Sequence, residues 1–153
     1  MERATEVATT VESSVESLVA VLERARLAQN PAVPPAQLRV LTIVAGNRHT
    51  NMSRLAETLG VVPSSASRLC DRLEATGLLR RVADPRDRRE VRLLLTPASR
   101  RLLDDLREHR QAALAEVLDR MSPEAQQDLV RALQAFETAA AGFPDARTGL
   151  RTA

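Results

Sequence analysis

Aromatic residues are almost absent from this sequence of 153 residues, which has no Trp, no Tyr and only Phe136 and Phe143. A hydrophobic core must therefore be built from Leu, Val and Ala, and a ligand would find no Trp or Tyr ring to stack on. The single cysteine excludes an internal disulfide framework and fits a reducing cytosol, so we expect a cytoplasmic protein.

Several other functional classes lack their sequence signatures. No apolar run approaches the roughly 20 residues of a membrane helix, and residues 1–18 lack the apolar stretch of a signal peptide, so we expect no membrane partner. Phosphate-binding glycine loops, hydrolase serine motifs and metalloprotease motifs are also missing. A catalytic serine would need a base, and neither His49 nor His109 has an obvious partner. The sequence predicts a protein that is not an enzyme, with no catalytic residue, cofactor or metal site.

What the sequence does contain is a local excess of positive charge. Residues 48–92 hold 10 Arg against 6 acidic residues, a surplus of four, whereas the rest of the chain holds 12 Arg against 14 acidic residues. A local surplus of this kind is expected where a polyanion binds. Taken alone it fits a solvated charged surface equally well.

Helical periodicity dominates both ends of the chain. Near the N-terminus it ends before Asn30-Pro31, and a second helix is expected from Pro34-Pro35 to Gly46-Asn47, with Leu38, Leu41 and Ala45 on one face. Thr96-Pro97 and Ser122-Pro123 predict the starts of two more helices. The apolar positions of the terminal helices are Val7, Val11, Val15, Leu18 and Leu22, then Leu102, Leu103, Leu106, Ala113, Leu114, Val117 and Leu118, then Ala125, Leu129, Leu133, Phe136 and Ala140.

These terminal stripes need a partner, and little of the chain remains to cover them. Packing within one chain and a homodimer that shares the terminal helices explain the pattern equally well.

Residues 51–79, NMSRLAETLGVVPSSASRLCDRLEATGLL, have the pattern of a helix-turn-helix. Asn51 is expected to cap the first helix, Gly60 to end it in the left-handed conformation, and Pro63 to begin the second. Val61 is expected to plug the turn between them. The positions expected to be buried are Leu55, Ala56 and Leu59 in the first helix and Ala66, Leu69, Cys70 and Leu73 in the second.

The second helix would present a polar face opposite its buried stripe. At about 100° per residue this face holds Ser64, Arg68, Asp71 and Ala75, with Ser65, Ser67 and Arg72 on its shoulders. Small hydroxyls let a backbone approach the DNA major groove, and Arg can donate two hydrogen bonds to guanine. Asp71 is expected to restrain Arg68 or Arg72. The alternative is that the serines only favour helix initiation and the arginines only add solubility.

Residues 78–83 and 90–95 alternate as two paired strands, with the charged sequence DPRDRR between them. Arginine on such a hairpin can insert into a narrow minor groove, where the negative potential is enhanced. A neighbouring aspartate can hold its guanidinium in place. The alternative is an exposed hairpin whose charges serve solubility.

Residues 54–96, RLAETLGVVPSSASRLCDRLEATGLLRRVADPRDRREVRLLLT, resemble the DNA-binding core of the MarR (multiple-antibiotic-resistance regulator) family. The pattern of helices extends the resemblance over residues 5–142. It implies one mainly α domain over residues 1–153: a winged helix-turn-helix lobe with a two-stranded β wing at 34–96, and long dimerisation helices at 5–32 and 97–142. Residues 144–153 are expected to form a flexible tail.

The resemblance also implies a function: a homodimer that binds a pseudo-palindromic DNA duplex and regulates transcription, most often as a repressor. In the wing motif, Asp84 and Asp87 would orient the arginines, and Arg89 would enter the minor groove. Arg88 stands where the family often has glycine. The implied DNA-binding residues are Pro63, Ser64, Ser65, Ser67, Arg68 and Arg72 in the helix and Arg86, Arg88 and Arg89 in the wing.

The family commonly binds small anionic or aromatic effectors beside its dimer helices, and Leu22, Arg26, Leu38 and His109 are the corresponding ligand-pocket candidates. Some relatives switch by oxidation of a cysteine in the first helix with tyrosine partners. Cys70 lies on a buried stripe instead, so we expect a core residue. Two other functions stay open: a winged helix that binds protein rather than DNA, and a sensor that binds DNA only with an effector or metal.

Overall fold

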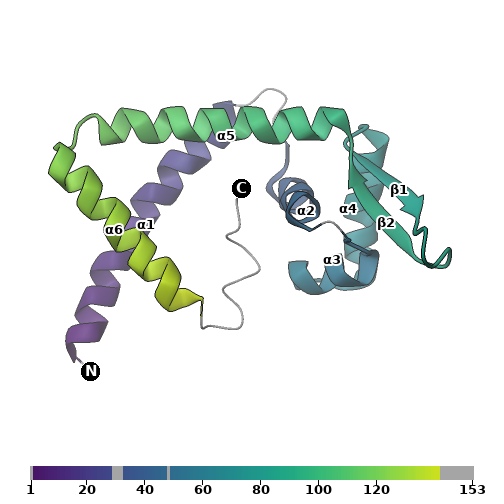
Figure 1. Ribbon diagram of the computed structural model, residues 1–153, viewed down its shortest axis with the longest axis horizontal. Helices are drawn as coiled ribbons and strands as arrows, with labels where there is room; N and C mark the ends of the chain where they lie inside the picture. Colours follow the sequence, from purple (N-terminus) through teal and green to yellow (C-terminus); the bar gives the residue numbers. More distant parts are fainter. Residues whose placement is uncertain (1, 29–32, 48, 142–153) are drawn as a thin grey trace. The chain divides into compact units, whose positions relative to one another are not determined.

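The computed structural model describes residues 2–28, 33–47 and 49–141 (Figure 1). The fold class is as the sequence predicted, mainly α with a two-stranded antiparallel sheet. The elements are α1 (Glu2–Ala28), α2 (Pro35–Gly46), α3 (Met52–Leu59), α4 (Pro63–Ala75), β1 (Leu79–Ala83), β2 (Val91–Leu95), α5 (Pro97–Leu118) and α6 (Pro123–Ala140). The expected tail, residues 144–153, lies outside the described residues, as do 29–32 and 142 at the ends of the expected dimerisation helices.

The chain divides into two compact units, one formed by residues 1–32 and 105–130 and the other by residues 33–104 and 131–153. The division falls inside α5, between Asp104 and Asp105. None of the helices in the described ranges is long and apolar enough to cross a membrane.

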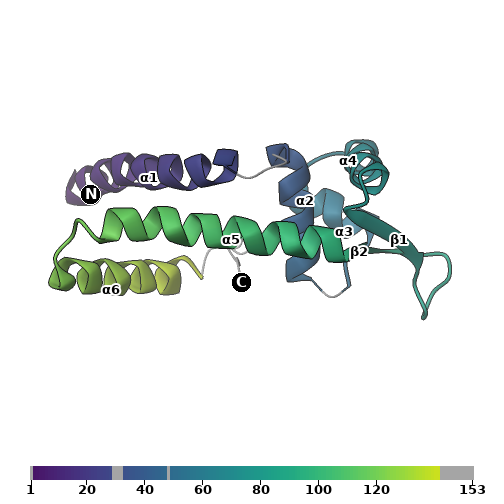
Figure 2. The ribbon, with the colours of Figure 1, turned by 90° about the horizontal axis from the view of Figure 1, so that it is seen from above.

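Figure 2 shows the turn that joins α5 to α6. Polar side chains close this turn. The Ser122 hydroxyl oxygen accepts a hydrogen bond from the Ala125 N–H (3.2 Å), as expected of the cap that begins α6. The Gln126 amide nitrogen donates to the Leu118 carbonyl at the end of α5 (2.8 Å). The side chains of Ser122 and Gln126 therefore pair a main-chain N–H of α6 and a main-chain carbonyl of α5 that have no partner within their own helices.

The second unit holds most of the buried side chains. Helix α2 contacts α3, α4 and β2, and it buries Leu38, Val40, Leu41, Ile43 and Val44. Ala45, predicted on one face with Leu38 and Leu41, is exposed, whereas Val40, Ile43 and Val44 are buried. Helix α2 packs against three elements, so it is buried on more than one side. Every large side chain of this core is aliphatic, as the shortage of aromatic residues requires.

Strands β1 and β2 pair antiparallel from Leu79↔Leu95 to Ala83↔Val91, within one residue of the predicted strands. Leu79 and Leu93 are buried and hold the hairpin onto the helices. The Leu93 N–H also donates to the carbonyl of Thr50, just before α3 (3.0 Å). The hairpin is thus fixed to the helix-turn-helix at its base.

A hydrogen bond also connects the start of α5 to the turn between α4 and β1. Thr96 and Ser99 cap the helix reciprocally: each backbone N–H donates to the other's hydroxyl oxygen, at 3.0 and 3.2 Å. The Thr96 hydroxyl donates to the carbonyl of Gly77, in the turn between α4 and β1 (2.7 Å). The predicted helix start at Thr96-Pro97 is confirmed. The hydrogen bond from Thr96 to Gly77 was not predicted from the sequence.

Candidate nucleic-acid interface

Helix α3 and the turn after it follow the predicted helix-turn-helix closely. The Asn51 side-chain oxygen accepts from the Arg54 N–H at 2.9 Å and caps α3. Gly60 adopts φ 67°, ψ 33°, and the N–H groups of Gly60 and Val61 donate to the carbonyls of Glu57 and Ala56 (both 3.1 Å). This pair of bonds ends α3 with a left-handed residue for which glycine carries no steric penalty.

The prediction that Val61 plugs this turn is wrong, since its side chain is 39% exposed. The main-chain bonds close the turn without it. Helices α3 and α4 pack against each other, and each buries a small residue, Ala56 in α3 and Ala66 in α4, which suits a close approach of two helices.

Helix α4 is oriented as its sequence predicted. Ala66, Cys70 and Leu73 are completely buried, and Leu69 is partly buried. The opposite face is exposed, and the shoulder residues Ser65 and Ser67 are half-buried. The exposed residues of α4 include Pro63, Ser64, Arg68, Asp71, Arg72 and Ala75. A polar, partly basic surface of the helix therefore faces away from the core of its unit.

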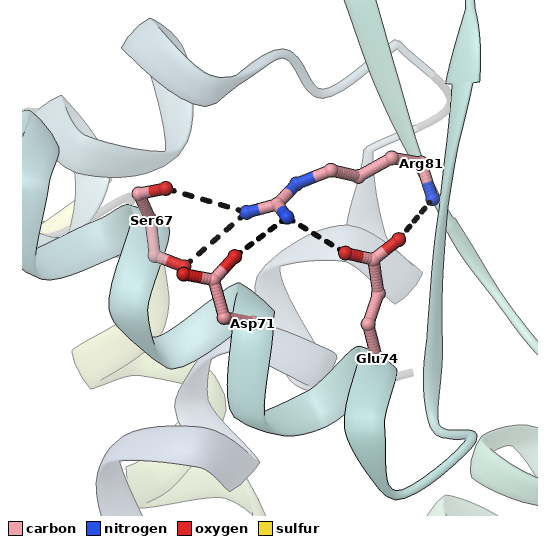
Figure 3. A network of polar contacts seen from close by, with 4 residues as sticks. All are labelled: Ser67, Asp71, Glu74 and Arg81. Atoms are coloured by element: carbon pink, nitrogen blue, oxygen red, sulfur yellow. Dashed lines mark hydrogen bonds and ion pairs between the residues drawn. The ribbon is translucent and has the colours of Figure 1, made fainter.

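Asp71 is not paired as predicted. Its carboxylate contacts neither Arg68 nor Arg72 but accepts from the Arg81 guanidinium of β1, with an N–O distance of 2.7 Å (Figure 3). Strand β1 packs against α4, which brings Arg81 within hydrogen-bonding distance of Asp71. Within the described residues, Arg68 and Arg72 have no side-chain ion pair.

Arg81 contacts three positions of α4. One terminal nitrogen donates to Asp71 and to Glu74 (2.7 Å each), and the other donates to the carbonyl and hydroxyl oxygens of Ser67, at 3.2 and 3.4 Å (Figure 3). The Arg81 backbone N–H donates to the second oxygen of Glu74 (3.2 Å). Burial alone would lower the pKa of Arg81, but the two carboxylates outweigh it and raise this pKa.

The aspartates of the wing motif hold the main chain of the loop between the strands. Asp84 accepts from the Arg86 N–H (2.7 Å), and Asp87 accepts from the Arg89 N–H (2.9 Å). The carboxyl of Asp84 has a lowered pKa, mainly because of the hydrogen bond from Arg86. Arg86, Arg88 and Arg89 are all exposed. Asp87 therefore accepts from the main-chain N–H of Arg89, whereas the sequence suggested a contact with the Arg89 guanidinium.

A hollow of about 340 Å³ lies at the base of this loop, lined by His49, Asp84, Pro85, Arg86, Asp87, Glu90 and Arg92. Glu90 also accepts from the Asn51 amide (3.4 Å), which joins the wing to the cap of α3. Sequence reasoning missed this contact, because it joins residues 39 positions apart.

Cys70 is a buried core residue, as predicted. Burial raises the pKa of its thiol to about 11, which keeps it protonated at neutral pH. No group of three or more His, Cys, Asp or Glu side chains in the described part of the chain is arranged to hold a metal ion.

The ligand-pocket candidates fall in both units. Leu22, Arg26 and His109 belong to the first, where Arg26 pairs with Glu23 (2.8 Å) and the His109 Nδ1–H donates to the Asp105 carbonyl (2.7 Å). Leu38 belongs to the second and is buried in its core. Their role in binding an effector stays a prediction.

Comparison with known proteins agrees with this geometry. Residues 33–90 match the model of the MarR family. In Bacillus subtilis, the HTH-type transcriptional regulator YfiV is 30% identical over 103 residues, and the HTH-type transcriptional repressor MdtR is 31% identical over 96 residues. These matches cover 67% and 63% of this chain and just under two thirds of the relatives, 64% and 62% of their lengths.

A solved structure extends the likeness to nearly the whole chain. The crystal structure of RV1404 from Mycobacterium tuberculosis is 33% identical, covers 94% of this chain and 97% of its own, and superposes with a TM-score of 0.79. The family model, the two regulators and this structure agree with the helix-turn-helix and wing found in the second unit. The chain belongs to the MarR family.

Proposed function

We propose that this protein is a transcriptional regulator that binds a pseudo-palindromic DNA duplex as a homodimer and represses transcription by covering a promoter. The observation that carries the proposal is the exposed polar face of α4, in the same unit as an exposed loop of three arginines. Both features are built on buried aliphatic residues, so they are held in place before DNA arrives.

The two parts of the surface suit different grooves of the duplex. Ser64, Ser65 and Ser67 are small enough for α4 to approach the major groove closely, while Arg68 and Arg72 can donate to guanine or phosphate. Arg86, Arg88 and Arg89 extend from the wing, and we infer that Arg89 enters the minor groove. Pro63 begins α4 at the end that would meet the base edges.

A second copy of the chain is the partner we propose for the terminal helices. Val7, Val11, Val15 and Leu18 recur along α1 at helical spacing, and all four are exposed. Helix α6 buries none of its residues, and its Phe136 is 62% exposed. Soluble monomers rarely expose large contiguous apolar patches, and rows of exposed apolar side chains along a helix favour a surface that another chain covers. A dimer made through these helices would cover it and would supply the second DNA-binding surface that a two-fold operator requires.

Selection of bound sequences from random DNA by the purified protein tests this function. We expect enrichment of an inverted repeat whose half-sites are centred about 10 bp apart. Gel shifts with the selected duplex should weaken steeply as salt rises, because phosphate contacts release counterions. The absence of any enriched sequence would contradict the proposal and favour a winged helix that binds protein.

Substitutions in α4 test which residues read bases. Ser67→Ala and Arg68→Ala should alter the selected sequence as well as the affinity, because we assign both residues to the major groove. A uniform loss of affinity across all sequences would reassign them to phosphate contacts. The same assay with small anionic or aromatic compounds added tests for an effector that weakens DNA binding, and with a chelator it tests for a required metal.

A further inference from the structure

The contact of Arg81 with α4 joins the two proposed DNA-reading elements. Leu79 and Arg81 are two residues apart on β1 and lie on the same face of the strand, so the buried Leu79 places Arg81 on the face that packs against α4. The Arg81 side chain is only 26% exposed. Its partners Ser67, Asp71 and Glu74 are spaced by four and three residues and therefore lie along one side of the helix (Figure 3).

This arrangement restricts how α4 can move relative to the wing. A guanidinium is planar, and its donors point in fixed directions. Here they are shared among two carboxylates and a serine, over two turns of α4, while Glu74 also accepts from the Arg81 backbone. Rotation of α4 about its axis, or sliding along it, would break several of these bonds together. Ser67 is both a partner of Arg81 and a proposed base contact.

The arrangement also changes the charge of the DNA-reading surface. Asp71 and Glu74 have side chains that are 59% and 34% exposed, next to positions where we place DNA. Unpaired carboxylates there would repel phosphates. The guanidinium offsets part of their charge, and Arg68 and Arg72 stay available because Asp71 is paired elsewhere.

We propose that Arg81 is a positioning residue for DNA recognition: it fixes the rotation of α4 relative to the wing through Ser67, Asp71 and Glu74, and it offsets the two carboxylates that would otherwise oppose the DNA. The proposal rests on the proposed function, DNA binding by α4 and the wing. Arg81 itself contacts no base, and it acts on sequence preference through the placement of Ser67 and its neighbours.

The test compares variants of the full-length chain on two duplexes, the selected operator and the same operator with one base pair changed in a half-site. Affinity is measured by fluorescence anisotropy, and discrimination is the ratio of the two affinities. Arg81→Gln is expected to bind the operator roughly tenfold more weakly, within the range of coupled polar networks, and to discriminate less. Circular dichroism and sedimentation confirm that each variant is folded and assembled.

Two further variants separate the two roles of Arg81. Arg81→Lys keeps the charge but cannot bridge both carboxylates and Ser67, so it should keep most of the affinity and lose discrimination. The triple variant Arg81→Gln, Asp71→Asn, Glu74→Gln removes the carboxylates together with their partner. It should recover affinity without recovering discrimination.

The matched control is Arg80→Gln, which removes the same charge from the neighbouring exposed residue on the opposite face of β1. It should keep the discrimination of the unaltered protein. Folded Arg81→Gln with unchanged affinity and discrimination would overturn the role of Arg81 alone. If Arg81→Gln fails to fold, unchanged discrimination in Arg81→Lys overturns it. Failure of the unaltered protein to bind any DNA would overturn the proposed function as well.

Discussion

Helices α2 and α6 both carry many apolar residues, yet their surroundings within one chain are opposite. Five of the 12 residues of α2 are buried, whereas α6 has 18 residues and buries none. Helix α2 packs against α3, α4 and β2, which supply its apolar partners. The second unit, which holds the proposed DNA-reading elements, therefore contains its own core, while the terminal helices carry apolar side chains that a single chain leaves exposed. On the basis of this contrast, we propose that each chain has its own DNA-reading surface. The terminal helices would then join two chains into a dimer.

The first way to sharpen this contrast is to remove a buried side chain from the core of the second unit. Leu41→Ala removes a completely buried side chain from α2 and should cost about 3 kcal/mol of unfolding free energy. Urea unfolding followed by circular dichroism measures this cost. The exposed Ala36→Ser in the same helix serves as a control and should cost less than about 1 kcal/mol. Equal costs would contradict the assignment of the core.

The second prediction concerns α6. Phe136→Glu places a charge on the proposed interface and should raise the dimer dissociation constant by about 100-fold, as loss of an aromatic anchor does, while each chain stays helical. Analytical ultracentrifugation measures the constant. Gln127→Glu, on the opposite side of α6 and also exposed, adds a negative charge without touching the apolar stripe, so it should leave the dimer intact. A wild-type chain that sediments as a monomer would refute the interface.

The third prediction tests the wing. Arg89→Ala should weaken operator binding by roughly 10- to 100-fold, an arginine contact being worth about 1–3 kcal/mol, without changing the unfolding curve. Its side chain is exposed, and its backbone N–H, which Asp87 holds, is retained in the variant. Arg101→Ala, an exposed arginine on α5, provides the charge-matched comparison. Wild-type affinity in Arg89→Ala would remove the wing tip from DNA binding.

The fourth prediction is a smaller effect at the base of the helix-turn-helix. Asn51→Ala removes the cap of α3 and the contact with Glu90, so it should cost about 1 kcal/mol of stability. Thermal unfolding measures the loss. Asn51→Ser keeps an uncharged side-chain oxygen that can accept from the Arg54 N–H, without placing a second carboxylate beside Glu90, and should retain most of that stability. If Asn51→Ser is as unstable as Asn51→Ala, the cap does not explain the loss.

The smallest effect is expected at Cys70. Because burial raises the pKa of its thiol to about 11, little thiolate forms at pH 8 in the folded protein. Ellman's reagent should therefore react slowly until urea unfolds the chain, and mild peroxide should leave DNA binding unchanged. Rapid labelling of the folded protein would contradict the assignment of Cys70 to the core.

Features that depend on residues close together in the sequence were predicted correctly, whereas features that depend on how elements pack were not. The Asn51 cap, the left-handed Gly60 and the rotation of α4 follow from residues within one or two turns, and the structure agrees with them. The partner of Asp71 and the exposure of Val61 were predicted wrongly. They depend on how β1 crosses α4 and how closely α3 and α4 approach, and local spacing does not specify either.

The Arg81 contact had a partial signal in the sequence. Asp71 and Glu74 share one side of a predicted helix, and Arg81 has the strand parity of the apolar Leu79. These facts predict that a charged residue of the strand faces the helix. They do not predict which strand and helix residues come into contact, because that depends on how the strand is positioned along the helix in the folded protein. DNA contacts remain proposals for a related reason, since they require a second molecule.

In the proposed complex, two copies of α4 occupy successive major grooves of one duplex. Dimethyl sulfate protection on the selected operator tests this arrangement most directly, because this reagent methylates guanine N7 in the major groove, where we place Arg68. We predict two protected patches related by two-fold symmetry and centred about 10 bp apart. Binding that leaves a single protected patch, or none in the major groove, would contradict the account.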